Sequence, residues 1–145
     1  MVDALRRAGR WVEPPLGCII DLRPAHVVPH IELGLPDGAH VPIGGLVVDA
    51  ERRERHMAAD LAVLAVVKQG LFTVEREQEF SFYRHPESVD ELRQYIATKW
   101  QHTRLDDATY ASAIDAQRAR PDGRLWLREQ VAIRVLRPAL DAGGA

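Results

Sequence analysis

The sequence has little of three features that would narrow its function. Cys18 is the only cysteine among 145 residues, so an internal disulfide is excluded and the reducing cytoplasm is the expected compartment. Lysine and arginine total 19 against 21 aspartates and glutamates. This balance argues against a nucleic-acid partner, which usually leaves a basic footprint. The longest apolar stretch, residues 61–67, is far shorter than the roughly 20 residues that span a bilayer, so we expect no membrane partner.

The size and composition of the chain are those of one globular domain. A length of 145 residues is sufficient to bury a core, and 46% hydrophobic with 28% charged residues is an ordinary balance. No internal repeat or low-complexity linker divides the sequence. We therefore expect a single domain over residues 1–138, followed by a flexible tail at residues 139–145.

One short run, Gly17-Cys18-Ile19-Ile20-Asp21-Leu22-Arg23-Pro24, is the element around which the rest is organised. Three consecutive apolar residues between chain breakers predict a strand covered on both faces, as in the middle of a parallel sheet. The same argument predicts that the thiol of Cys18 is buried and inert, since reactive thiols need exposed, electropositive surroundings.

The remainder alternates between helical and strand-like patterns. Apolar spacing and capping residues predict helices near residues 2–10, 50–69, 88–100 and 106–119. The turn sequence Leu35-Pro36-Asp37-Gly38 predicts a β-hairpin between residues 30–35 and 39–48, and alternation predicts strands at 71–83 and 124–136. The expected fold class is α/β, in the form of an α+β-like half-fold. Its mixed sheet has about three to five strands, including the hairpin, and is flanked by about four helices.

This order of elements resembles the C-terminal half of a class I S-adenosylmethionine-dependent methyltransferase. In that family an apolar strand follows a proline-glycine turn, commonly after a leucine-arginine pair. Here Leu5-Arg6-Arg7 precedes Pro14-Pro15-Leu16-Gly17, and residues 18–22 match the strand. The resemblance implies that a helix then crosses to a further strand and that the last strand returns antiparallel between the two. Residues 50–69, 71–83 and 124–136 would fill those places.

The family's cofactor site has no counterpart in this sequence. The glycine-rich turn and the acidic residue that hold S-adenosylmethionine belong to the N-terminal half, and no G-x-G-x-G occurs here. The resemblance therefore implies no cofactor unless the missing half is supplied, and whether the chain is an enzyme is left open. The leading hypothesis is a half-domain, non-catalytic alone, that binds small molecules or proteins. The alternatives are a methyltransferase completed by a partner chain or truncated from a longer enzyme, and an unrelated α+β ligand-binding domain.

A half-fold would leave one edge of its central strand unpaired, and such an edge invites pairing with another chain. A symmetric homodimer could join two such edges, a separate chain with the missing half could dock there, or the hairpin could fold back and cover it. Self-association is the favoured expectation.

The candidate ligand contacts come from three parts of the chain. Asp21 and Arg23 end the predicted central strand, where α/β sheets bind ligands, although Asp21 would also be satisfied by pairing with Arg23 or a backbone amide. His26 lies four residues before His30, but an intervening proline and the lack of nearby cysteines argue against a metal site, and histidines exposed on a hairpin are the alternative.

Aromatic and histidine side chains supply the remaining candidates. Tyr83 and Trp100, together with His85, His102 and Trp126, would line a cleft over the helical segment, or would belong to the core or a lid. The candidate ligand-binding set is therefore Asp21, Arg23, His26, Tyr83 and Trp100, with no metal site.

Overall fold

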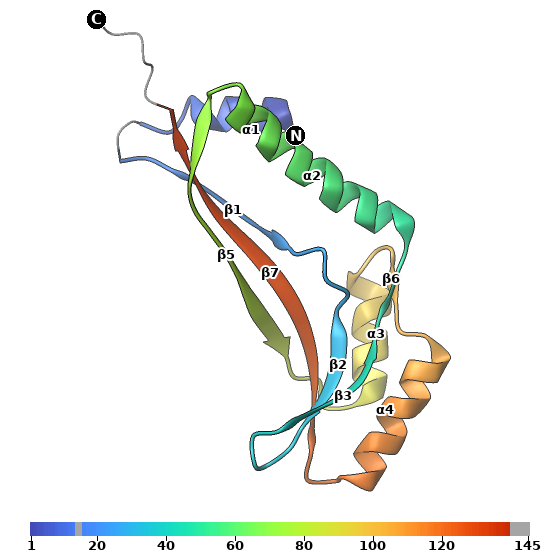
Figure 1. Cartoon of the computed structure of the whole chain (residues 1–145). Coiled ribbons are helices and arrows are strands. Elements are labelled where there is room, and N and C mark those ends of the chain that lie inside the picture. The colour runs from blue at the N-terminus through green and yellow to red at the C-terminus, as the bar shows by residue number, and fades with distance from the viewer. Residues whose placement is uncertain (14–15, 140–145) are drawn as a thin grey trace, which may run out of the picture. The chain divides into compact units, whose positions relative to one another are not determined.

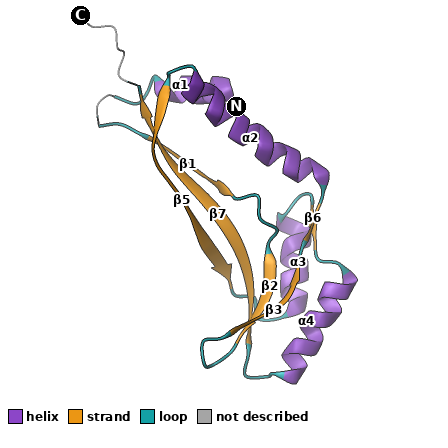
Figure 2. Cartoon of the chain, viewed as in Figure 1, coloured by secondary structure: helices purple, strands orange, loops and turns teal. Residues whose placement is uncertain are grey.

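The computed structural model describes residues 1–13 and 16–139. It is an α/β protein, drawn in Figures 1 and 2. The helices are α1 (Val2–Gly9), α2 (Ala50–Lys68), α3 (Val89–Lys99) and α4 (Asp107–Ala119). The strands are β1 (Ile19–Pro24), β2 (His30–Gly34), β3 (His40–Gly45), β4 (Val47–Val48), β5 (Phe72–Arg84), β6 (Thr103–Arg104) and β7 (Arg124–Pro138). The predicted turn at residues 14–15 and residues 140–145 of the predicted tail lie outside the described residues.

The chain forms two compact units. Unit 1 comprises residues 1–25, 55–80 and those from 131 onward, and unit 2 comprises residues 26–54 and 81–130. The helix α2 and the strands β5 and β7 each contribute residues to both units. The single domain expected over residues 1–138 stays a prediction. No helix in the described part of the chain has the length and apolar character needed to cross a membrane.

Unit 1 is built on the C-terminal half of β7. The strand β1 pairs with it in antiparallel register, from Ile19 opposite Leu136 to Pro24 opposite Val131, and β5 also pairs with β7. The last strand therefore pairs with both β1 and β5. The apolar core of this unit contains Val63, Val66, Phe72 and Leu136, with Val2, Leu5, Ile19 and Val67 packed against them.

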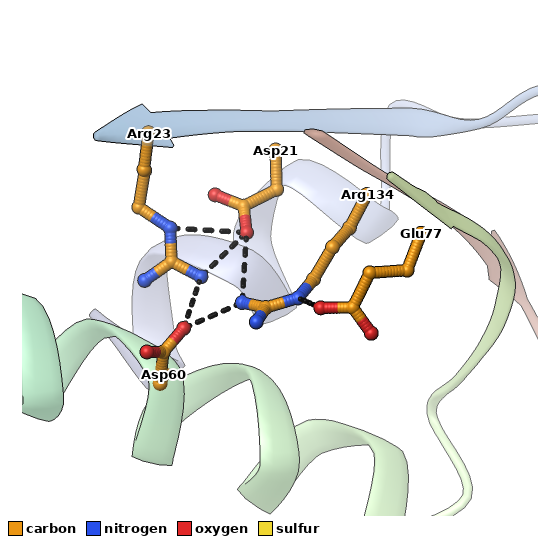
Figure 3. A network of polar contacts seen from close by, with 5 residues as sticks. All are labelled: Asp21, Arg23, Asp60, Glu77 and Arg134. Atoms are coloured by element: carbon orange, nitrogen blue, oxygen red, sulfur yellow. Dashed lines mark hydrogen bonds and ion pairs between the residues drawn. The ribbon is translucent and has the colours of Figure 1, made fainter. Parts of the chain in front are cut away.

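The environment of β1 differs from the prediction. The strand is antiparallel to its neighbour and is open on one face, because Ile20 and Leu22 are 62% and 57% exposed. Asp21 and Arg23 alternate with them and point toward the helix α2 (Figure 3). The expectation of a strand buried on both faces in a parallel sheet is thus wrong. Cys18, predicted to be buried, is exposed.

Unit 2 contains the predicted hairpin. The strands β2 and β3 pair in antiparallel register with a shift between Ile31 and Glu32. The backbone N–H of Gly38 donates to the carbonyl oxygen of Leu35 at 3.0 Å. The side chain of Asp37 accepts from the next-but-one backbone N–H at 2.9 Å. Gly38 has a φ of 86°, which glycine adopts without steric cost, so the turn forms for the reasons that its sequence indicates.

The sheet of unit 2 continues from the hairpin into β7. The strand β2 pairs with residues 124–128 in antiparallel register. The helices α3 and α4 begin at N-cap residues, where Ser88 and Asp106 accept hydrogen bonds from the N–H groups of Glu91 and Thr109. Their apolar sides share one core with the sheet, formed by Ile31, Leu33, Leu46, Val89, Leu92, Ile96, Leu105, Ala113, Leu125 and Leu127. Side chains alternate along a strand, so Trp126 lies on the opposite sheet face from this core.

Candidate functional site

Two of the predicted site residues, Asp21 and Arg23, belong to an ion-pair network in unit 1 (Figure 3). The guanidinium of Arg23 donates to the Asp21 carboxylate at 2.6 and 3.1 Å and lies 3.1 Å from the Asp60 carboxylate. Arg134, on β7 opposite Asp21, donates to Asp60 and Glu77 at 2.5 Å each. The network therefore joins β1, β7, β5 and α2.

The charged ends in this network face one another (Figure 3). The side chains of Arg23 and Arg134 are each 19% exposed. Burial by itself lowers the pKa of Arg134, but its hydrogen bonds to Asp60 and Glu77 outweigh burial, and the pKa is raised. This geometry favours the reading of Asp21 as the partner of Arg23, and a ligand-facing role for either residue stays a prediction.

A second polar arrangement lies on the sheet face of unit 2 that carries Trp126. Glu32 is buried, at 8% exposed. One of its carboxylate oxygens lies 3.0 Å from Nδ1 of His40, and the other accepts from Arg128 at 3.3 Å. The carboxylate of Glu32 thus has one basic side chain at each of its two oxygens.

Aromatic rings surround Trp126 next to this carboxylate–imidazole pair. The ring centroids of His40, Tyr83 and His85 lie 4.6, 5.0 and 4.2 Å from that of Trp126, with interplanar angles of 80°, 77° and 85°. Such edge-to-face contacts are favourable for aromatic rings. We call Glu32, His40, Tyr83, His85 and Trp126 the Trp126 cluster. It draws its members from β2, β3, β5 and β7 and from the residue that follows β5.

A cavity of about 380 Å³ adjoins the Trp126 cluster. It is lined by Gly34, Leu35, Pro36, Gly38, His40, Asp122, Arg124 and Trp126. A Cβ atom on Gly34 would lie 2.7 Å from Nε1 of Trp126, so the absence of a side chain lets the indole lie directly against the strand. The cavity is thus bounded by the hairpin turn, the indole and the beginning of β7.

The two charged residues in the cavity lining, Asp122 and Arg124, differ in whether a described residue of opposite charge pairs with them. The carboxylate of Asp122 accepts a hydrogen bond from Nε of Arg120 at 3.3 Å, and this bond lowers its pKa. No carboxylate pairs with Arg124 anywhere in residues 1–13 and 16–139. The lining therefore includes one arginine that has no acidic partner in the described part of the chain, beside apolar and aromatic residues.

The predicted five-residue cleft is divided between two places. Tyr83, His85 and Trp126 are brought together, whereas Trp100 has other neighbours. The guanidinium of Arg52 lies 5.1 Å from the centre of the Trp100 ring, a cation–π distance. His102 instead contacts the Asp49 carboxylate at 3.0 Å through Nδ1.

Arg52 connects Trp100 to a half-buried acidic residue. It donates to the hydroxyl of Thr103 at 2.5 Å and lies 3.8 Å from the Glu129 carboxylate. Burial raises the pKa of Glu129, although the charges of Arg52 and Arg84 oppose that effect. Burial also lowers the pKa of Arg52. Trp100 thus packs against the guanidinium of Arg52, and that guanidinium in turn lies near the carboxylate of Glu129.

His26 lies in the bend between β1 and β2 and is exposed. Among the described residues, no group of three or more histidine, cysteine, aspartate or glutamate side chains is arranged to hold a metal ion. Sequence reasoning named Tyr83 and Trp126 but gave no role to Glu32 or Arg124. The register that sets Glu32 opposite Trp126 is the missing information, since no local pattern in either segment specifies it.

No protein-family model, curated protein or solved structure matches the chain. The resemblance to a methyltransferase C-terminal half therefore stays a prediction.

Proposed function

We propose that the chain is a protein-interaction module that self-associates through β1. The observation that carries the proposal is the exposure of Ile20 and Leu22, at 62% and 57%, on a strand with a β neighbour along one edge only among the described residues. An edge strand that presents apolar side chains to water is a template for pairing with another chain. Natural monomers usually protect such edges with charges, and here the charges point the other way.

The face of the sheet around Ile20 and Leu22 is apolar beyond β1 itself. Their partners on β7 are Val135 and Ile133, and Pro24 lies opposite Val131. Cross-strand partners lie on the same face of a sheet, so these six side chains form a continuous apolar strip. Asp21, Arg23 and Arg134 occupy the other face. A second β1 strand paired along the free edge would place its own apolar strip beside this one, and the side chains that meet across the seam would be removed from water, at about 25 cal/mol per Å² of apolar area.

The residue order of β1 favours a second copy of this chain as the occupant. If two β1 strands pair in antiparallel register about a twofold axis at Leu22, Asp21 of each copy lies opposite Arg23 of the other. Ile20 then lies opposite Pro24, and the two Leu22 side chains meet. Opposite charges directly across a ladder stabilise it, and a twofold interface needs a surface that complements itself in this way.

The oligomeric state tests this proposal. Light scattering and sedimentation from low micromolar to about 100 µM are expected to reveal a dimer, because mass action favours association as concentration rises. Leu22→Lys places a charge at the twofold axis and should leave a monomer. Leu61→Lys is the matched control, since Leu61 is 62% exposed, close to the 57% of Leu22, but lies on α2, and it should leave the dimer intact. A wild-type chain that stays monomeric over the whole range contradicts self-association.

A methyltransferase completed by a partner chain is the second candidate. The pairing of β7 with both β1 and β5 supports it, because the resemblance implies that order, and the free edge of β1 would then receive the missing half. A thermal-shift titration of the chain alone with S-adenosylmethionine and S-adenosylhomocysteine distinguishes this candidate from the interaction module. Saturating ligand at about 100 times its dissociation constant would stabilise a binding protein by about 2.7 kcal/mol, whereas the interaction module is expected to give no shift.

A further inference from the structure

We propose that the cavity beside Trp126 in unit 2 binds a small aromatic carboxylate, with its carboxylate on Arg124 and its ring against the indole. This site is separate from β1 and does not depend on self-association. It is formed by two segments far apart in sequence, the hairpin turn at residues 34–40 and the stretch at residues 122–126.

The charge of the cavity selects an anion. Asp122 is engaged by Arg120, which leaves its negative charge partly compensated. Arg124 has no acidic partner in the described part of the chain. A guanidinium presents parallel N–H donors that fit a carboxylate in bidentate fashion. A single guanidinium matches one negative charge, which favours a carboxylate over a doubly charged phosphate.

The apolar part of the lining selects a ring. Leu35, Pro36 and Trp126 line the cavity together, and Gly34 allows the indole to lie directly against the strand without a Cβ in the way. His40, Tyr83 and His85 hold the indole from other sides, so it is positioned before any ligand arrives. A volume of about 380 Å³ is near the lower end of the range for small-molecule sites, which suits one ring rather than a dinucleotide.

The Glu32–His40 pair supports the wall of this site. His40 lines the cavity, and its ring is fixed by the bond from Nδ1 to Glu32. Glu32 is in turn held by Arg128. A ligand therefore meets a rigid surface, and rigid sites lose less entropy when they bind.

Titration of the full chain with benzoate, followed by ¹H–¹⁵N correlation spectra, tests the proposal. The expected result is saturable shifts of the Trp126 indole N–H and of the Gly34 and Gly38 amides. Benzamide lacks the charge and cyclohexanecarboxylate lacks the aromatic ring, so each should bind about tenfold more weakly than benzoate.

Two variants make the test specific to the cavity. Arg124→Gln should weaken benzoate binding about tenfold. Arg118→Gln removes an exposed cation from α4, outside the cavity lining, and should leave binding unchanged. Equal binding of benzoate by wild type and Arg124→Gln, equal affinity for benzamide, or shifts confined to other residues would each overturn the assignment.

A further variant tests the role of the indole. Gly34→Ala puts a methyl group 2.7 Å from Nε1 of Trp126 and should displace the ring, with a loss of benzoate binding of about tenfold. A Gly34→Ala chain whose spectrum shows the native fold and whose affinity is unchanged would also overturn the proposal.

Discussion

At the scale of single residues, Glu32 holds the polar side of the Trp126 cluster together. Its carboxylate is almost fully buried and receives bonds from His40 and from Arg128, one on each oxygen. A buried charge is stable only when it is paired and hydrogen-bonded. The side chain thus fixes the ring of His40 on one strand and the guanidinium of Arg128 on another.

Replacement of Glu32 by glutamine should destabilise the chain by about 1–3 kcal/mol. The amide has the same shape, but it lacks the negative charge that faces two donors, and its NH₂ group meets one of them. Urea denaturation followed by circular dichroism measures the change in the free energy of unfolding. Glu79→Gln is the control, since Glu79 is an exposed residue of β5 and its variant should stay within about 0.5 kcal/mol of wild type. Equal losses for the two variants would show that the buried pair contributes nothing particular.

The candidate site illustrates how far single residues can be read from a sequence. Aromatic residues near strand ends pointed to Tyr83, His85 and Trp126, and these three rings do meet. Arg124 and Glu32 were not predicted as site residues, because a single arginine or glutamate in a strand carries no functional signal until the pairing of the strands is known. The ion-pair network was foreseen in part: Arg23 was named as the partner of Asp21, but Arg134, the other partner of Asp21, and Asp60, which pairs with both arginines, lie 113 and 39 positions from Asp21 in the chain.

At the scale of elements, the start of α4 depends on one carboxylate. Asp106 accepts a bond from the N–H of Thr109 at 2.7 Å, and this bond lowers the pKa of Asp106. A lowered pKa means that the folded chain favours the charged form. The stabilisation that the Asp106 carboxylate gives to the folded chain is therefore complete above the pKa of aspartate in the unfolded chain, about 3.9. This stabilisation is lost as the pH falls through the lower pKa of Asp106 in the folded chain.

Replacement of Asp106 by alanine should lower the melting temperature at pH 7 by about 2–5 °C, since an N-cap is lost. The gap between wild type and Asp106→Ala should narrow as the pH is taken below about 4. Asp106→Asn is the matched control, because asparagine caps helices equally well without a titrating group. Thermal melts of the three chains from pH 7 to pH 3 measure the effect. A gap that is constant over this range would contradict the assigned role of the charge.

Local sequence patterns predicted the positions of the helices and strands well, but they predicted the pairing and packing of these elements less well. The expected helices and strands are present with similar ends, because capping, turn chemistry and apolar spacing act within a few residues. The exception is the strand expected over residues 39–48, which is divided into β3 and β4 in different sheets. The two-residue strand β6 was missed, since its pairing with β4 is long-range. The strand β1 was placed at the centre of a parallel sheet because Cys18, Ile19 and Ile20 are consecutive and apolar. In the fold, the inward face of β1 is satisfied by ion pairs instead, and sequence periodicity does not reveal that solution.

At the scale of the whole molecule, self-association would make stability depend on concentration. A dimer that does not persist after unfolding is stabilised by mass action. The melting temperature of the wild-type chain should therefore rise as its concentration is raised about tenfold, whereas that of Leu22→Lys should stay constant. Differential scanning fluorimetry and calorimetry at matched concentrations measure the difference. Identical concentration dependence in the two chains would contradict a dimer held by β1.

The long strand β7 gives the chain an order of events during translation. Both units pair strands with it, β1 in unit 1 and β2 in unit 2, and every one of their other strands leaves the ribosome earlier. The hairpin of β2 and β3 can close at once, but β1 must wait for more than a hundred residues, from Pro24 to Val131, to be synthesised. During that interval the apolar run of β1 has no native partner, so nascent chains should recruit chaperones at this segment and release them once β7 emerges.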